Sequence, residues 1–283
     1  VEAIERRAEE SCQRLVSSDA DYLPGIVVEI YGDVVWVCLE TAAARAQSDV
    51  VAEVIREIVN PVEIVVSADG VPVTLSGQGL KGRWVDLDEL LFRIDLLDTT
   101  KPRVFLDQRE QHALFGSLCE GRSLLDLFSH SGGFAMQALR AGAEHALAVD
   151  SEDSYVKAIG ANAQRNELRV DALTADALGY LGEVDARAFD ALVIDPPAGY
   201  YLEAQRLNEL HEQAFRKLPQ AALLATYCRD VSLADFESLV AKAAADAGRE
   251  ARIFARTSQP FDYPMLLNFP ESQVVRGLIL QVE

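Results

Sequence analysis

Acidic side chains follow successive predicted strands in the second half of the chain. Asp126 lies at the end of the strand predicted over 123–128, Asp150 follows the strand at 146–149, and Asp176 follows the strand at 168–173. Carboxylates at these places can accept hydrogen bonds from ribose hydroxyls and from an adenine amino group. A single acid after a strand is more often a helix cap. Three in succession, at one edge of a parallel sheet, predict a site for a nucleoside-type cofactor.

The loop after the first of these strands, residues 128–133, combines small residues with the start of a predicted helix. Serine and glycine let a ligand approach the backbone, and unpaired N–H groups point out of a helix N-terminus. The loop lacks the GxGxxG pattern of nicotinamide and flavin binders and the GxxxxGK[ST] pattern of nucleoside triphosphate binders. The loop residues expected to line the ligand are Phe128, Ser129, Ser131, Gly132 and Gly133.

Two further reactive groups follow later strands. Asp195 precedes Pro196 and Pro197, which donate no backbone hydrogen bond and hold the chain extended, so that the carboxylate faces the cleft. Cys228 ends the strand predicted at 222–227, and Arg229 beside it would favour the thiolate. Cys228 is therefore a candidate nucleophile, although free cysteine is also a common buried residue. None of the four histidines has a partner at catalytic spacing; His130 is expected only to line the pocket.

The elements that must position these residues divide the chain in two. From Gln108 onward, predicted strands alternate with helices, which indicates βαβ units and a mostly parallel sheet. The last two strands, at 251–255 and 274–282, have no helix between them and predict an antiparallel hairpin at the sheet edge. The preceding part reads as a small α+β domain, with helices expected over 2–15 and 42–59. We predict an α/β protein with domains at 1–104 and 105–283.

Composition limits the partners. The net charge is −19 and both halves are acidic, which argues against a polyanionic partner. An RNA substrate stays open if a local basic strip exists, drawing on Lys101, Arg103, Arg109 and Arg229. The four cysteines form no CxxC pair, which argues against a metal site. No apolar run approaches the ~20 residues needed to cross a bilayer. We expect a cytoplasmic protein without membrane contact, and the sequence leaves a homodimer open.

The runs Leu125 to Ala135, Ala148 to Ser151 and Asp195 to Pro197 resemble class I S-adenosylmethionine-dependent methyltransferases. More narrowly, the chain is similar to the bacterial large-subunit rRNA cytosine-C5 methyltransferase family. Segments at 22–25 and 262–264 extend the similarity over nearly the whole chain. The resemblance implies a Rossmann-like sheet, S-adenosyl-L-methionine as the cofactor, and catalytic roles for Cys228 and Asp195. It implies cofactor contacts for Arg109, Asp126, Phe128, Ser129, Ser131, Gly132, Gly133, Asp150, Ser151, Asp176, Asp195 and Pro196.

The sequence departs from that family in places that bear on the substrate. The chain has no room for the family's N-terminal RNA-binding PUA domain before Glu2. Tyr227-Cys228-Arg229 replaces the family's Ser-Cys-Ser, and Ala198-Gly199 follows the two prolines. Three functions therefore stay open. These are methyl transfer to cytosine C5 of RNA, methyl transfer to a nitrogen with Cys228 incidental, and a non-catalytic relative that keeps the fold.

Overall fold

The computed structural model describes residues 11–68, 70–75, 82–97, 104–200 and 204–283. It divides into two compact units. The first comprises Val1–Asp107 together with Pro260–Gln273, and the second comprises Gln108–Gln259 together with Val274–Glu283. The division lies at 107/108, three residues after the predicted 104/105. A segment near the C-terminus, between the last two strands, belongs to the first unit.

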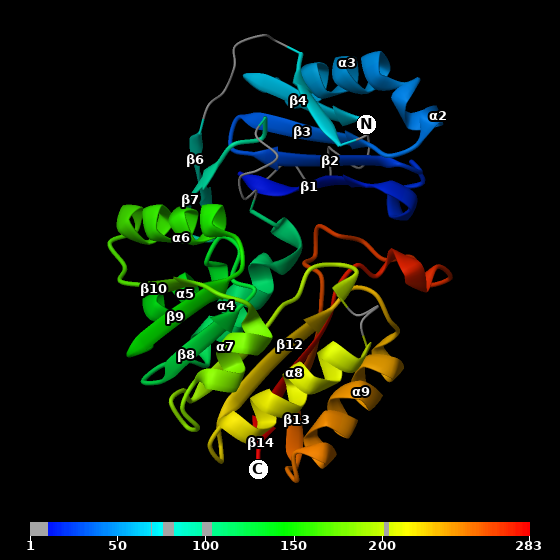
Figure 1. Cartoon of the computed structure of the whole chain (residues 1–283). Coiled ribbons are helices and arrows are strands. Elements are labelled where there is room, and N and C mark those ends of the chain that lie inside the picture. Colours follow the sequence, from blue (N-terminus) through cyan, green and yellow to red (C-terminus); the bar gives the residue numbers. More distant parts are fainter. Residues whose placement is uncertain (1–10, 69, 76–81, 98–103, 201–203) are drawn as a thin grey trace. The chain divides into compact units, whose positions relative to one another are not determined.

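The first unit contains a sheet of strand order β1-β2-β3-β4-β5 (Figure 1). All its neighbours are antiparallel except β3 and β4, which are parallel. Helices α2 and α3 connect β3 to β4, and β6 pairs with β7 outside this sheet. The bounds are β1 Cys12–Ser17, 3-10 helix η1 Ser18–Asp21, β2 Ile26–Tyr31, β3 Val34–Leu39, α2 Ala42–Arg45, α3 Ser48–Ile58, β4 Glu63–Ala68, β5 Val71–Thr74, β6 Arg83–Leu87, β7 Leu90–Ile94 and η4 Pro270–Ser272.

One helix prediction for the first unit is wrong, and a second is confirmed except for a break. The helix expected over 2–15 is instead strand β1 from Cys12 onward, and residues 2–10 lie outside the described part of the chain. The strand forms because Leu15 and Val16 are buried and β2 supplies a pairing partner, which a local pattern does not reveal. The helix expected over 42–59 is broken at Ala46 and Gln47 into α2 and α3.

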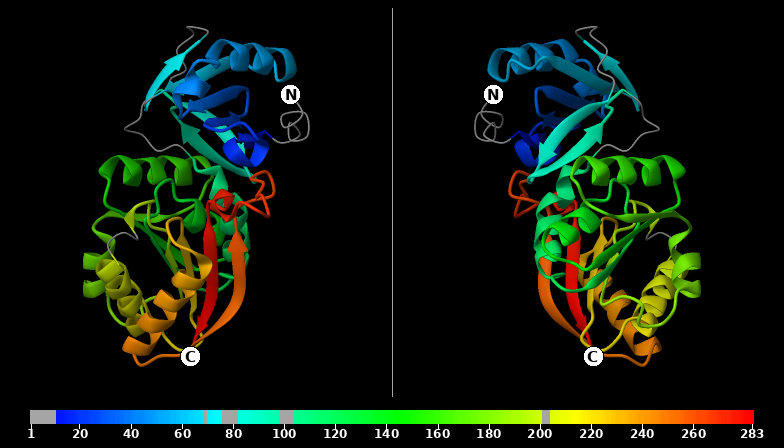
Figure 2. Two further views of the ribbon diagram at one scale, coloured as in Figure 1. Left: turned by 90° about the vertical axis from the view of Figure 1, so that its right-hand side faces the viewer. Right: turned by 90° about the vertical axis from the view of Figure 1, so that its left-hand side faces the viewer.

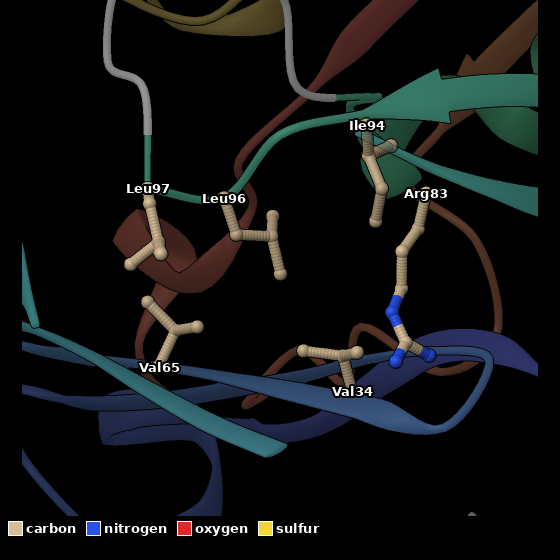
Figure 3. Close-up of a pocket in the computed structure, with 6 residues that line it drawn as sticks. All are labelled: Val34, Val65, Arg83, Ile94, Leu96 and Leu97. Atoms are coloured by element: carbon tan, nitrogen blue, oxygen red, sulfur yellow. The ribbon is translucent and has the colours of Figure 1, made fainter. Parts of the chain in front are cut away.

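Figure 3 shows a small hollow within the first unit. Aliphatic side chains of strands and the following loop surround it, and the lining residues are Val34, Val65, Arg83, Ile94, Leu96 and Leu97. The guanidinium of Arg83 is engaged by the carboxylate of Asp33. No thiol, imidazole or carboxylate lines this hollow, so its described walls offer no nucleophile or general base.

The second unit contains a sheet of strand order β10-β9-β8-β11-β12-β14-β13. β8 to β12 run parallel, and β14 is antiparallel to both β12 and β13. The antiparallel pair, orange and red, forms one edge of the sheet (Figure 2). The 3-10 helix η2, Leu106–Gln108, spans the point where the chain passes from the first unit to the second. The bounds in the second unit are α4 Arg109–Ser117, β8 Ser123–Leu127, α5 Gly133–Arg140, β9 His145–Asp150, α6 Asp153–Arg165, β10 Asp171–Thr174, α7 Ala177–Glu183, β11 Ala191–Ile194, α8 Ala204–Lys217, β12 Leu223–Cys228, α9 Leu233–Asp246, β13 Ala251–Ser258 and β14 Arg276–Val282.

Helices cover both faces of this sheet. One apolar core joins the strands to α7, α8 and α9 and includes Leu181, Phe215 and Phe236. The other joins them to α4, α5 and α6 and includes Phe115 and Phe134. The predicted α/β sheet with an antiparallel edge hairpin is thus confirmed. Helix α7 was not predicted.

Candidate functional site

The cofactor loop, residues 128–133, leaves the carboxyl end of the central strand β8. In the sheet register Asp126 pairs with Ala148 of β9 and Val193 of β11, so β8 lies between the strands that carry Asp150 and Asp195. The Oδ2 atom of Asp126 accepts a hydrogen bond from the backbone N–H of Ala135 in the first turn of α5. This bond fixes the start of α5, and with it the loop, against the strand.

Three alternate residues of the loop have a left-handed backbone. The φ angles are +61° at Phe128, +48° at His130 and +83° at Gly132. Such angles cost a non-glycine residue roughly 1–2 kcal/mol. Phe128 and His130 therefore adopt the conformation that glycine takes without strain. Aromatic contacts offset part of this cost, since Phe128 meets Tyr200 and His130 meets Tyr155 edge-to-face at centroid distances of 5.1 and 4.7 Å.

Buried polar atoms of the loop fit a polar ligand. Oδ1 of Asp126 and Oγ of Ser129 are buried and have no hydrogen-bond partner among the described residues. Leaving such groups unsatisfied is costly, so a ligand that donates to them would be stabilised. Burial raises the pKa of Asp126 well above its usual range; the Ala135 N–H opposes this, while Asp195 and Asp150 add to it. Ser131 is also buried, and its carbonyl accepts a hydrogen bond from Nδ2 of Asn162, a residue that sequence reasoning missed.

Asp150 ends β9, where its carboxylate holds the loop. Its Oδ2 accepts from the N–H of His130 and its Oδ1 from the N–H of Glu152, at 2.9 and 3.0 Å. A carboxylate has about four lone-pair sites, so acceptor capacity remains for ribose hydroxyls. Ser151 is exposed beside it. The predicted ribose contact is thus compatible with these backbone bonds and stays a prediction.

Asp176 follows β10 and caps helix α7. Its Oδ2 accepts from the N–H of Gly179, and its Oδ1 is engaged by Arg206. This is the capping role that a lone acid at a strand end commonly has. With 54% of its side chain exposed, Asp176 still has a surface on which an adenine amino group could bind.

Asp195 directly follows β11 and is paired with a cation. Its Oδ1 accepts from Nη1 of Arg229 at 2.7 Å, and the same nitrogen lies 3.4 Å from the carbonyl oxygen of Pro196. Both side chains are largely shielded from solvent. Pro196 itself is buried. The charge of Asp195 raises the pKa values of Asp126, His112 and Tyr227.

Cys228, at the end of β12, faces the other side of the sheet. Its side chain is fully buried in the core that contains α8 and α9, whereas the preceding Tyr227 packs in the core with Phe134. Burial raises the pKa of Cys228, although N–H groups of Val231 and Asp230 act against this. Arg229 pairs with Asp195 rather than with the thiol. Attack by the thiolate on a base held at Asp195 needs both side chains in one cavity, and the burial of Cys228 does not provide this arrangement. The nucleophilic role stays a prediction.

An aromatic stack, not predicted from the sequence, supports the site. The ring of His112 meets Phe134 edge-to-face at 4.4 Å, and Phe134 stacks on Tyr227 at 5.3 Å. Burial lowers the pKa of His112 to about 4, with Asp195 raising it and Arg229 lowering it. No partner of His112 could be predicted from sequence spacing, because the residues around its ring belong to α5 and β12, which are distant from it in the sequence.

The expected basic strip is not formed by its described members. Arg109 is 6% exposed and Arg229 is ion-paired with Asp195. Lys101 and Arg103 lie outside the described residues. In the described part of the chain, no three histidine, cysteine or acidic residues are grouped so that they could hold a metal ion. Nor does any helix described here have the length and apolar character to cross a membrane.

Comparison with known proteins identifies the class. The family model "Conserved hypothetical protein 95" matches residues 98–250. A "putative methyltransferase complexed with SAH" superposes with a TM-score of 0.87 at 19% identity, over 98% of this chain and 77% of that one. This likeness shows a shared fold, and the sequence relatives define the class as S-adenosylmethionine-dependent methyltransferases, whose cofactor is S-adenosyl-L-methionine.

Sequence relatives narrow the family. Ribosomal RNA large subunit methyltransferase I of Shewanella amazonensis is 30% identical, over 95% of this chain and 74% of the relative. The protein of the same name from Tolumonas auensis is 29% identical, over 97% and 76%. The chain belongs to the family of ribosomal RNA large subunit methyltransferase I.

Proposed function

We propose that this chain methylates a nucleobase of large-subunit ribosomal RNA, with C5 of a cytosine as the target atom. The observation that carries the proposal is the position of Asp195 and Pro196. They directly follow β11, whose last residue Ile194 pairs with Leu127, the last residue of β8 before the cofactor loop. The carboxylate and the Pro196 carbonyl are therefore acceptors beside the cofactor, suited to the amino group of a flat base. The names of the relatives support RNA as the substrate.

In this proposal the bound cofactor supplies a methyl group on a sulfonium. Asp126, Ser129 and Asp150 hold and orient it, because their free or remaining acceptor sites lie along the cofactor loop. Asp195 and the Pro196 carbonyl orient the base by accepting hydrogen bonds from its amino group. Such positioning lowers the barrier by removing the need to bring the two reactants together.

Transfer to C5 needs a nucleophile because this carbon is too weakly nucleophilic by itself. The Cys228 thiolate would form a bond to C6, while N3 takes a proton that passes from solvent through the Asp195 carboxylate, and C5 gains electron density. The methyl group that the bound cofactor would supply is then accepted by C5. Loss of the C5 proton to solvent and of the N3 proton to Asp195 breaks the sulfur–C6 bond and restores the thiolate. The route requires the Cys228 side chain to turn out of the core that contains α8 and α9.

The burial of Cys228 favours a second candidate, methyl transfer to a nitrogen of a base. Here no thiolate is needed, because an amino nitrogen carries its own electron pair. Asp195 and the Pro196 carbonyl would hold that amine, and Cys228 would only fill the core. The two candidates share the cofactor and the fold and differ in the atom that receives the methyl group.

One experiment tests both candidates. The full chain is titrated with S-adenosylhomocysteine in a calorimeter and then incubated with S-adenosylmethionine and protein-free large-subunit rRNA. Nucleosides from the digested RNA are analysed by mass spectrometry. 5-Methylcytidine formed by the wild type and abolished in Cys228→Ala, with cofactor affinity unchanged, supports C5 transfer. An N-methylated nucleoside, with Cys228→Ala active, supports the second candidate. Cofactor binding without methylated RNA contradicts both and points to a non-catalytic relative or another substrate.

A further inference from the structure

Arg229 joins the loops that follow β11 and β12. Its Nη1 lies 2.7 Å from Oδ1 of Asp195 and 3.4 Å from the carbonyl oxygen of Pro196. Its own carbonyl accepts from Nη1 of Arg276 at 3.3 Å. The side chains of Arg229 and Asp195 are only 18% and 14% exposed, so their attraction is screened less by water than that of a surface pair.

A second hydrogen-bonded contact joins the same two loops. The backbone N–H of Gly199 donates to both carboxylate oxygens of Asp230, at 3.0 and 2.9 Å. Gly199 has a φ of +88°, which disfavours other residues. Gly199 and Arg229 both belong to stretches where the sequence departs from the family pattern. In the structure the loop that contains Gly199 and the loop that contains Arg229 are joined by these hydrogen bonds, so the two departures from the family pattern lie in contact.

We infer that Arg229 occupies the place of the substrate's amino group and is exchanged for it when the base binds, its guanidinium then pairing with a phosphate of the RNA. The inference rests on the proposed function, which assigns the acceptors Asp195 Oδ1 and Pro196 O to that amino group. A single nitrogen of Arg229 now reaches both acceptors. An amino group with two N–H donors can replace it bond for bond.

The charge balance explains why a phosphate is needed. Once the neutral base has taken its place, the guanidinium has lost its carboxylate partner, and leaving a shielded cation unpaired is costly. A phosphate offers the replacement anion in a geometry that suits a guanidinium. Arg229 therefore makes base binding depend on the backbone of the nucleic acid and disfavours free nucleosides.

The first test measures the salt dependence of RNA binding. The full chain, saturated with S-adenosylhomocysteine, is titrated with protein-free large-subunit rRNA over a range of salt concentrations. Each phosphate contact contributes about 0.7–0.9 to the slope of log K against log salt. We expect Arg229→Ala to reduce the slope by about this amount and Arg229→Lys to restore it. Arg256→Ala is the control and should leave the slope unchanged. Arg256 is an exposed cation on the edge strand β13 and pairs with Glu237 of α9.

The second test compares cytidine with its 5′-monophosphate as methyl acceptors. The wild type should prefer the monophosphate, and Arg229→Ala should lose this preference by gaining activity on cytidine relative to the monophosphate. An unchanged salt slope in Arg229→Ala overturns the inference. A ratio of activities on cytidine and its monophosphate that is the same in the wild type and in Arg229→Ala also overturns it. Circular dichroism of each variant checks that it is folded. Failure of the proposed function is seen separately, as a wild type that forms no methylated nucleoside in rRNA.

Discussion

The imidazole of His112 lies where a side chain on Gly133 would have to stand. An ideal Cβ on Gly133 would come within 2.4 Å of Cε1 and 2.5 Å of Nδ1 of that ring. Gly133 is the first residue of α5, directly after the loop glycine Gly132. The buried ring therefore sets how closely α4 approaches the N-terminus of α5 and the cofactor loop.

Gly133→Ala should consequently destabilise the protein and weaken cofactor binding. Forcing a methyl group into a packed site costs roughly 1–3 kcal/mol, measured here as the free energy of unfolding in urea. His112→Ala in the same chain should recover part of the loss, because it removes the atoms that clash. Gly160→Ala is the matched control, since Gly160 lies inside α6 with no atom near its Cβ position. It should be neutral or stabilising by up to about 1 kcal/mol. Additive effects of Gly133→Ala and His112→Ala would contradict the contact.

Asp150→Asn should weaken binding of S-adenosylhomocysteine. A hydrogen bond to a charged group contributes about 1.5–3 kcal/mol, which corresponds to a roughly ten- to hundredfold higher Kd. Calorimetric titration measures it. Asp171→Asn is the control, because Asp171 is exposed on β10 and pairs with His145. An unchanged Kd in Asp150→Asn would contradict the assignment of this carboxylate to the ribose.

Two buried histidines should reduce stability as the solution is acidified. Burial lowers the pKa of His211 to about 4, opposed by its hydrogen bond to the Leu207 carbonyl, and it lowers the pKa of His112 to a similar value. The unfolded chain takes up these protons near pH 6.5, whereas the folded chain does not until about pH 4. Their contribution to stability is therefore complete above pH 6.5 and is lost as the pH falls toward 4, by roughly 3 kcal/mol for each fully buried ring.

The measurement is the urea unfolding free energy between pH 7 and pH 4, for the wild type and for His211→Gln. His211 lies 2.8 Å from Oγ1 of Thr226, so glutamine can keep a hydrogen bond without titrating in this range. The variant should show a shallower decline with acidity. Asp126, whose pKa is raised by burial, acts in the opposite direction in both proteins and cancels in the comparison. Parallel curves would show that His211 is not the group responsible.

Glu29 should be the most sensitive polar residue of the first unit. Its carboxylate accepts from Arg14 at 2.8 Å, from Tyr263 at 3.0 Å and from Tyr31 at 2.9 Å. Glu29→Ala removes the acceptor that Arg14 and Tyr263 share, and breaking a buried ion pair costs about 3–5 kcal/mol. Asp33→Ala, which removes an exposed pair with Arg83, should cost less than about 1 kcal/mol. Equal effects of the two variants on urea unfolding would contradict this difference.

The sequence alone determined the architecture of the second unit and the places of its acids. The alternation of strands and helices predicts the parallel sheet, and the turn residues locate the loop at 128–133. These signals are local, because hydrophobic periodicity and loop composition follow from each segment's own burial. They suffice to place Asp126, Asp150 and Asp195 at one sheet edge. The family resemblance, carried by the same segments, agrees with the comparisons.

Only the tertiary structure decided which way side chains face and which charges are paired. Neighbouring residues of a strand point to opposite faces, so that Tyr227 joins the site while Cys228 joins the core with α8 and α9. The partner of Arg229 is Asp195, which lies on another strand and is not adjacent in sequence. Strand β1 likewise depends on pairing with β2. Each outcome rests on contacts between distant segments, whose energies no local pattern contains.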